Sequence, residues 1–192
     1  MDIRKRFTPK LIACYLLVAV LLCWAQPEMD TLIWGFIPIV LGEALRIWGT
    51  GHLQKNEAVI VSGPYAYIRD PLYVGTLLIL SGFCVAARVY EFLIPVWACF
   101  FLYYLPYKKR REGNRLSAKF GATYDNYRKQ VMAVFPRLSP YKGEGSRAPW
   151  SAKLISDNSE TGTAVSIAVL FALLLLKYIY CPDCVFPDWH WL

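Results

Sequence analysis

Two polar segments stand out in this otherwise apolar chain of 192 residues, and each combines charged side chains with aromatic ones. The first covers residues 62–75 and carries an adjacent arginine and aspartate, Arg69 and Asp70, among several tyrosines. Pro64 and Pro71 each fix one backbone dihedral and bias the preceding residue away from helix, so the chain between them is held in an irregular shape. A stiff loop of this composition predicts a ligand-binding loop rather than a linker.

The second segment, residues 108–112, is a run of four cations followed by a carboxylate, Lys-Lys-Arg-Arg-Glu. Such cations can hold the carboxylate or phosphate of a bound molecule. The alternative is that they border a bilayer and attract anionic lipid headgroups, which is worth about 1 kcal/mol each near the surface. For Glu112, the alternative to a role in a site is a surface ion pair with Arg115, three residues further along a helix. Both interpretations stay open at this level.

The elements that must position these segments are membrane helices. Hydrophobic residues make up 56% of the chain and aromatic residues 16%, whereas a soluble domain is roughly 45–50% apolar. A helix needs about 20 residues to cross a hydrocarbon layer of ~30 Å. Five apolar stretches approach that length, which predicts an all-α, polytopic membrane helical bundle. The predicted spans are Leu11–Gln26, Thr31–Thr50, Pro71–Ala87, Glu91–Tyr107 and Thr161–Tyr180.

Basic residues predict which side of the membrane each loop occupies, because short loops rich in Lys and Arg stay in the cytoplasm. With the N-terminus in the cytoplasm, residues 51–70 and the basic segment 108–153 also lie there, and the C-terminal tail, residues 181–192, lies outside. No small-residue cleavage site follows the first span, so we interpret it as an anchor and not as a removed secretion signal. The net charge of +7 is then a membrane feature, and we predict no nucleic-acid partner from it.

The segment after the fourth predicted span has the period of an amphipathic helix. Its apolar positions recur at intervals of three or four residues: Leu116, Phe120, Tyr124, Tyr127 and Val131. Gly121 interrupts the pattern, so one helix or two short ones are both possible. This cytoplasmic segment either lies on the membrane or covers the loop at residues 62–75. We infer the architecture of a pocket between the spans that is capped from the cytosol.

Other polar residues are weaker candidates. Glu43 and Arg46 fall on one face of the second span, where a charged side chain usually faces a partner or a watery cavity. The simpler alternative is that Arg46 reaches the interface and neutralises Glu43. Residues 181–184 form a Cys-Pro-Asp-Cys motif that fits a disulfide, two thiols, a redox pair or part of a metal site. His52 has too few ligand-type neighbours to indicate a metal site, and no metal is predicted.

Three motifs that occur in order resemble those of one family of membrane enzymes. Residues 41–48 read Leu-Gly-Glu-Ala-Leu-Arg-Ile-Trp, residues 63–75 read Gly-Pro-Tyr-Ala-Tyr-Ile-Arg-Asp-Pro-Leu-Tyr-Val-Gly, and the third motif runs from Glu112 to Pro136. Together they resemble the isoprenylcysteine carboxyl methyltransferase and phospholipid methyltransferase superfamily. Within a single membrane domain of residues 1–192, the resemblance implies a methyltransferase-like core at 41–138. A cytoplasmic linker at 139–160 and an additional helix at 161–180 follow that core.

The resemblance implies S-adenosylmethionine as cofactor and methyl transfer to a lipid, or to a prenylated or acylated amphiphile, at the cytoplasmic face. Such a reaction depends mainly on orienting two bound partners. The catalytic residues would be Glu112, which binds the ammonium group of the cofactor or assists the acceptor, and Lys108 or Arg111, which holds an acceptor carboxylate or phosphate. The cofactor would lie against Val61, Gly63, Tyr65, Arg69, Asp70, Pro71, Tyr73 and Glu112.

The chain also departs from the pattern of that superfamily. Asp70 stands where histidine or asparagine is common, Gly113 where a second glutamate is common, and Lys108 where an arginine is frequent. An ionised aspartate only accepts hydrogen bonds, and lysine lacks the planar fork of arginine. Three other functions therefore stay open: a sterol-type membrane reductase that uses NADPH, a non-catalytic lipid-binding protein, and a thiol-disulfide membrane protein built on Cys181 and Cys184.

Overall fold

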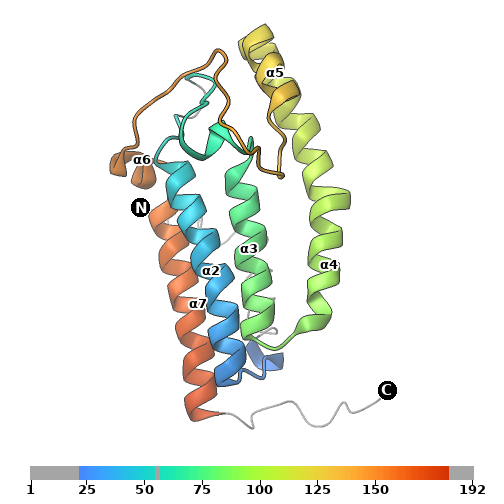
Figure 1. Ribbon diagram of the computed structural model, residues 1–192. Helices are drawn as coiled ribbons and strands as arrows, with labels where there is room; N and C mark the ends of the chain where they lie inside the picture. The colour runs from blue at the N-terminus through green and yellow to red at the C-terminus, as the bar shows by residue number, and fades with distance from the viewer. Residues whose placement is uncertain (1–21, 55–56, 182–192) are drawn as a thin grey trace, which may run out of the picture.

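The computed structural model describes residues 22–54 and 57–181, and within them the chain is an all-helical bundle (Figure 1). The one β-type contact among these residues is an isolated bridge between Ile60 and Ser146. The prediction of an all-α membrane bundle is confirmed. Among the described residues, two helices, α2 and α7, are long and apolar enough to cross a membrane. Most of the first predicted span, Leu11–Gln26, lies outside the described residues.

Helices α2 (Met29–Thr50) and α3 (Pro71–Ala86) lie side by side along their length, and glycines make the contact possible. A Cβ placed on Gly35 would lie 2.5 Å from the carbonyl oxygen of Gly82, and one on Gly42 would lie 2.6 Å from that of Gly75. Small residues allow two backbones to approach closely where no water is available to drive packing. The predicted spans Thr31–Thr50 and Pro71–Ala87 therefore correspond to a tightly packed helix pair.

The fourth predicted span, Glu91–Tyr107, does not end where the sequence turns basic. A short 3-10 turn, η3 (Tyr90–Phe92), leads into α4 (Leu93–Ala98), a π-helical turn η4 (Cys99–Tyr104) and α5 (Leu105–Gln130). The chain thus continues as one helical rod from the apolar stretch into the amphipathic segment. Pro106 lacks an N–H and crowds the preceding turn, and the wider π-helical turn lies directly before it.

The rod breaks at Gly121, as one of the two sequence alternatives predicted. Its backbone there has φ 54° and ψ −133°, far from helical values. A positive φ of this kind is easily adopted only by glycine. The change of direction turns the last part of α5 back over the loop at residues 62–75, so that Tyr124, Tyr127 and Val131 pack with Val59 and Val61 in one buried cluster.

The remaining helices cover the other side of α2. Residues 131–151 cross one end of the bundle to α6 (Ala152–Asp157), and α7 (Glu160–Tyr180) then returns beside α2 (Figure 1). The region predicted as a linker, residues 139–160, thus contains α6. The rings of Phe36 and Phe171 join α2 to α7 with centroids 5.2 Å apart.

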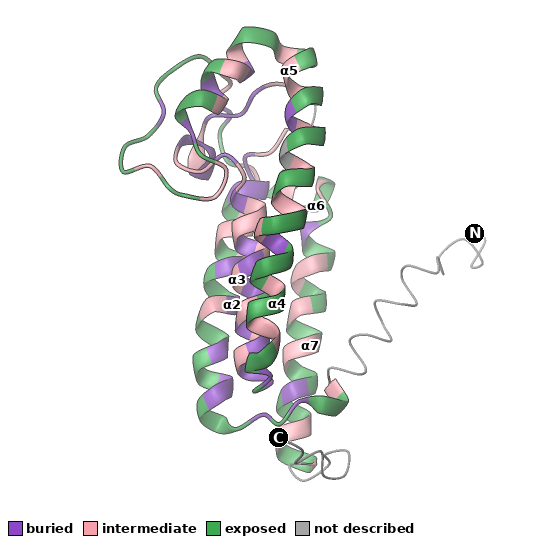
Figure 2. Cartoon of the chain, turned by 90° about the vertical axis from the view of Figure 1, so that its right-hand side faces the viewer, coloured by how far each residue is buried: buried purple, intermediate pink, exposed green. Residues whose placement is uncertain are grey.

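The outer surfaces of the helices are exposed and apolar. Figure 2 shows exposed residues along the outer faces of α2 and α4. Trp34 of α2, Ile94 of α4 and Leu102 of η4 are among the exposed apolar side chains. The outer face of α7 carries exposed valines, leucines and an isoleucine. In a membrane protein such faces contact lipid tails, so their apolar side chains are not exposed to water. The orientation of the bundle relative to the cytoplasm stays a prediction.

Candidate functional site

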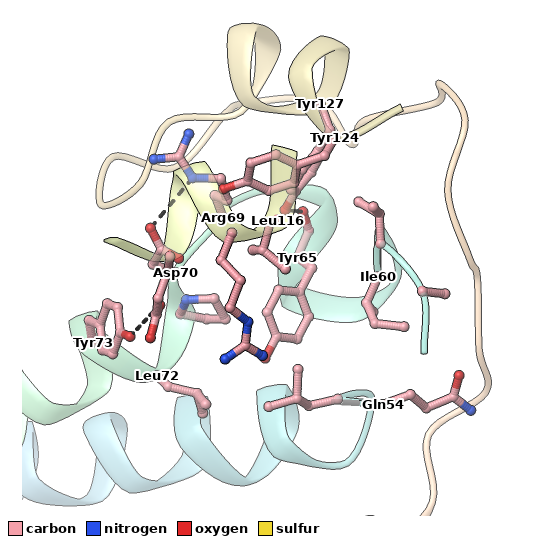
Figure 3. Close-up of a pocket in the computed structure, with 16 residues that line it drawn as sticks. Gln54, Ile60, Tyr65, Arg69, Asp70, Leu72, Tyr73, Leu116, Tyr124 and Tyr127 are labelled. Carbon is pink, nitrogen blue, oxygen red and sulfur yellow. Dashed lines mark hydrogen bonds and ion pairs between the residues drawn. The ribbon is translucent and has the colours of Figure 1, made fainter. Parts of the chain in front are cut away.

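A cavity of about 460 Å³ lies where the Pro64–Pro71 loop meets the end of α5 (Figure 3). Three segments far apart in the sequence form its walls: residues 53–60, residues 65–73 and residues 112–127. The lining residues are Leu53, Gln54, Ala58, Val59, Ile60, Tyr65, Arg69, Asp70, Pro71, Leu72, Tyr73, Glu112, Arg115, Leu116, Tyr124 and Tyr127. The two polar segments singled out from the sequence therefore meet at one cavity.

Backbone hydrogen bonds hold the loop against the segment that follows α5. The amide N–H of Arg69 donates to the carbonyl of Met132 over 2.9 Å, and that of Asp70 donates to Ala133 over 3.1 Å. The hydroxyl of Tyr127 donates to the backbone carbonyl of Tyr65 over 2.7 Å, inside the protein. Buried polar groups that are paired in this way resist separation, since breaking them leaves an unsatisfied donor or acceptor. The cavity walls are thus tied together.

A hydrogen-bonded triad lies at one side of the cavity, beside α3. The hydroxyl of Tyr73 donates to Glu112 Oε2 over 2.7 Å, and Lys108 Nζ donates to Glu112 Oε1 over 3.0 Å. The ammonium group of Lys108 also lies 5.7 Å from the ring centroid of Tyr73, within cation–π range. The hydrogen bond to Glu112 raises the pKa of Lys108 above its usual value, so the lysine stays protonated. A phenol, a carboxylate and an ammonium group are thus linked in one network.

The other side of the cavity combines a buried arginine with tyrosines. Arg69 is only 7% exposed; its Nη1 donates to the carbonyl of Arg128 over 3.3 Å, and its Nε lies 3.5 Å from Asp70 Oδ2. Burial raises the pKa of the Tyr65 and Tyr127 hydroxyls, which therefore stay protonated. This side offers aromatic faces next to a positive charge.

The structure brings most of the predicted site residues to this cavity. Those on its walls are Tyr65, Arg69, Asp70, Pro71, Tyr73 and Glu112. Lys108 reaches it only through Glu112, and Arg111 is exposed and donates instead to the hydroxyl of Tyr107 over 2.8 Å.

Two predicted cofactor contacts lie behind the wall. Val61 is 1% exposed and belongs to the buried cluster under α5. Gly63 begins the 3-10 turn η2 (Gly63–Ala66) with φ 56°, and its α-carbon faces the ring of His52. Both residues shape the loop from beneath and do not reach the cavity.

Several wall residues carried no signal in the sequence. Gln54, Ala58 and Ile60 belong to a short connection after α2 that shows neither a charge pattern nor a periodic one. Leu116 and Tyr124 were predicted only as the apolar face of a helix. Their helical spacing indicates that they face something buried, and only the fold shows that this is a cavity.

The charged residues of α2 form a separate cluster. Arg46 Nε and Nη2 pair with both carboxylate oxygens of Glu160 at 2.7 and 2.9 Å, and Arg46 Nη1 donates to Thr76 Oγ1 over 2.6 Å. Glu43 lies 3.9 Å from Arg46 Nε, and both of its carboxylate oxygens are buried without a hydrogen-bond partner. The neutralising partner expected from the sequence was Glu43, whereas the structure supplies Glu160 from α7.

Fold and site together define an all-helical membrane protein with a polar, aromatic cavity at one end of the bundle. A family model described as "Ergosterol biosynthesis ERG4/ERG24 family" matches residues 50–141. The chain is similar to the cobalt-zinc-cadmium resistance protein CzcN of Cupriavidus metallidurans, with 32% identity over 125 residues, and to the nickel-cobalt-cadmium resistance protein NccN of Alcaligenes xylosoxydans xylosoxydans, with 27%. Each match covers 64% of this chain and little more than half of the relative, 56% and 57%. No solved structure matches.

These findings correct the predicted reaction. S-adenosylmethionine-dependent methyl transfer is wrong, because the members of the matching family are sterol reductases that use NADPH. The chain also departs from the methyltransferase pattern at positions 70 and 113. An ionised aspartate at position 70 only accepts hydrogen bonds, and Gly113 removes one of two expected carboxylates. The motifs that carried the resemblance describe how a loop and a helix close over a cavity, and this architecture does not specify the cofactor.

Proposed function

We propose that the chain is a sterol-type membrane reductase, which uses NADPH to reduce a carbon–carbon double bond of a lipid-soluble substrate. The observation that carries the proposal is that the residues lining the cavity all lie within the range matched by the family model. All of the residues that line the cavity fall between Leu53 and Tyr127, and the family match spans residues 50–141. The part of the chain that resembles the reductase family is therefore the part that builds the cavity.

The side chains at the cavity suit the chemical groups of a nicotinamide dinucleotide. Arg69 and Arg115 bring positive charge for phosphate oxygens, and the rings of Tyr65 and Tyr124 offer faces for a planar base. Asp70 offers acceptor oxygens for ribose hydroxyl groups. When bound, the reduced nicotinamide would supply a hydride to one carbon of the double bond. The protein has to supply a proton to the other carbon.

The hydroxyl of Tyr73 is the proton donor that this geometry favours. It lies on the cavity wall and already donates to Glu112, which in turn accepts from the Lys108 ammonium group. Loss of the tyrosine proton would leave a phenolate beside a carboxylate. The protonated lysine at the far oxygen of that carboxylate offsets this negative charge and can return a proton through the same hydrogen bonds. The triad therefore resembles a short proton relay.

The apolar part of the cavity suits the rest of such a substrate. Ile60, Leu72 and Leu116 lie on its walls among the polar groups. An apolar molecule that binds against these side chains is removed from water, which favours binding by about 25 cal/mol for each Å² buried. A substrate of this kind would bring a double bond next to the Tyr73 hydroxyl while most of its surface stays in an apolar environment.

Tyr73→Phe is the variant that tests the proposal. The purified chain is incubated with NADPH and a sterol-containing lipid extract, and reduced products are separated by mass spectrometry. We expect turnover to fall about a hundredfold, because a positioned general acid contributes at least that much, with the affinity for NADPH unchanged. Tyr103→Phe, on the exposed face of η4, is the matched control and should retain full turnover.

Ligand-induced stabilisation provides an independent test that needs no substrate. NADPH should raise the melting temperature of the purified chain, and Arg115→Gln should weaken that effect. Stabilisation by S-adenosylmethionine with no response to NADPH would overturn the proposal.

The names of the two relatives indicate a physiological setting. Both are named for resistance to divalent metals. We propose that the activity of this chain is used under metal stress. Among the described residues, no group of three or more His, Cys, Asp or Glu side chains is placed to hold a metal ion. Deletion of the chain should increase sensitivity to cobalt, zinc or cadmium, and the Tyr73→Phe variant should fail to restore resistance.

A further inference from the structure

A second cavity, of about 610 Å³, lies next to Arg69, which also lines the first cavity. One wall comes from η4 and the start of α5, which contribute Phe101 and Leu105, and the other comes from the end of α5 and the segment after it. Nothing in the proposed reductase reaction uses this space. The two cavities share only Arg69 on their walls.

The charge at this second cavity is positive. Arg69, Arg128 and Lys129 line it, against a single carboxylate, Asp125, which accepts a hydrogen bond from Ser117 over 2.8 Å. Arg69 is engaged by Asp70. Arg128 and Lys129, in contrast, make no ion pair within residues 22–54 and 57–181. Two cations at the rim thus lack a counter-charge from the described protein.

The same rim is apolar where it faces outward. Met132 is 61% exposed and Phe135 is 64% exposed, and both line the cavity. Phe101 and Leu105 extend the apolar wall into the predicted fourth span. An exposed apolar patch directly beside unpaired cations, at the end of a membrane helix, is the arrangement that binds an anionic headgroup and the beginning of its acyl chains.

We propose that this cavity binds an anionic phospholipid, with the phosphate between Arg128 and Lys129 and the proximal acyl chain against Phe101 and Phe135. The ligand that this cavity would recognise is a phosphate ester joined to an apolar tail. A basic cavity without exposed aromatic and sulfur-containing side chains would suit a free phosphate equally well. Here the apolar rim adds a second contact that only a lipid can fill.

The test measures lipid affinity of the full-length purified chain in a zwitterionic detergent, without NADPH, so that its result is independent of the reductase assignment. Short-chain phosphatidylglycerol, short-chain phosphatidylcholine and glycerol 1-phosphate are titrated separately, and binding is followed by native mass spectrometry. We expect phosphatidylglycerol to bind about fivefold or more tightly than phosphatidylcholine, the factor that corresponds to about 1 kcal/mol per cation. Glycerol 1-phosphate should bind weakly.

Variants at the rim make the test specific. Lys129 is exposed, so Lys129→Gln leaves the fold intact and should reduce the preference for phosphatidylglycerol about fivefold. Asp125→Asn removes the opposing carboxylate and should strengthen the binding. Lys153→Gln, an exposed cation on α6, is the control and should change nothing. An unchanged preference in Lys129→Gln, an equal loss in Lys153→Gln, or glycerol 1-phosphate binding as tightly as the lipid would each overturn the proposal.

Discussion

The Arg46–Glu160 ion pair joins the last helix of the chain to the closely packed α2–α3 pair, and its loss should destabilise the fold in a way that depends on a third residue. Both charges are largely buried, with side-chain exposures of 15% and 5%. Glu160 also accepts a hydrogen bond from Thr50 Oγ1 over 3.3 Å. The perturbation that we consider is Glu160→Gln, which keeps the shape of the side chain and one acceptor oxygen but removes its charge.

The magnitude follows from what Arg46 would contact afterwards. Removing one partner of a buried ion pair typically destabilises a protein by about 3–5 kcal/mol, because the remaining charge is left uncompensated. Here Glu43 lies 3.9 Å from Arg46 and its carboxylate oxygens have no other hydrogen-bond partner. A small movement of Arg46 would pair it with Glu43, so we expect Glu160→Gln alone to lower the free energy of unfolding by only about 2 kcal/mol. Glu43→Gln alone should change it by less than about 0.5 kcal/mol.

The double variant, Glu43→Gln with Glu160→Gln, tests whether Glu43 replaces Glu160 as the partner of Arg46. With both carboxylates replaced, Arg46 has no negative partner, and the loss should reach about 4 kcal/mol, well above the sum of the single changes. Reversible unfolding in mixed detergent micelles, followed by circular dichroism, measures these differences, and Glu57→Gln on the exposed surface controls for the loss of a carboxylate. Additive effects of the two substitutions, within about 0.5 kcal/mol, would refute the reasoning.

Three further changes test other contacts. Gly42→Val should destabilise the helix pair by about 3 kcal/mol or more in the same unfolding assay, because its side chain would meet the backbone of α3. Tyr127→Phe should lower the free energy of unfolding by about 1–2 kcal/mol, because it leaves the buried Tyr65 carbonyl unpaired, and an unaltered stability would contradict that hydrogen bond. Lys108→Gln should lower stability by less than about 1 kcal/mol, since the pair with Glu112 is partly exposed. The pKa of Lys108 is raised in the folded state. The stability difference between the variant and the parent chain is therefore fully present below the unfolded pKa of about 10.4, and it disappears as the pH rises through the higher folded pKa. A stability difference that grows with pH would exclude the pair with Glu112 as its cause.

Much of the bundle was predictable because a run of apolar residues is enough to locate a membrane helix in the sequence. The apolar stretches at residues 31–50, 71–87 and 161–180 appear as α2, α3 and α7, with ends that differ by one or two residues. The continuous rod from α4 into α5 was not predictable in this way. A change from apolar to basic residues marks the edge of the bilayer, and it does not end a helix unless a residue there breaks the hydrogen bonding. Gly121 does break it, and that position was identified from the sequence.

The candidate site was predictable only in its charged and aromatic part. Arg69, Asp70 and Tyr73 attracted attention because their types are unusual beside a membrane helix. The reaction assigned to them was wrong, because the same architecture of loop and helix serves different cofactors. The walls around Gln54 and Ile60 had no signal, since their role depends on which distant segment packs against them.

The sequence by itself determined the helical, membrane-bound class of this protein, the stiff Pro64–Pro71 loop and the break at Gly121, since each of these follows from steric limits and apolar content within a few neighbouring residues. The tertiary structure decided that Glu160 neutralises Arg46, that Glu112 meets Tyr73, and that Arg69 lines two cavities. These contacts join residues that are tens of positions apart. Their formation depends on how whole helices pack, which no local pattern of side chains records.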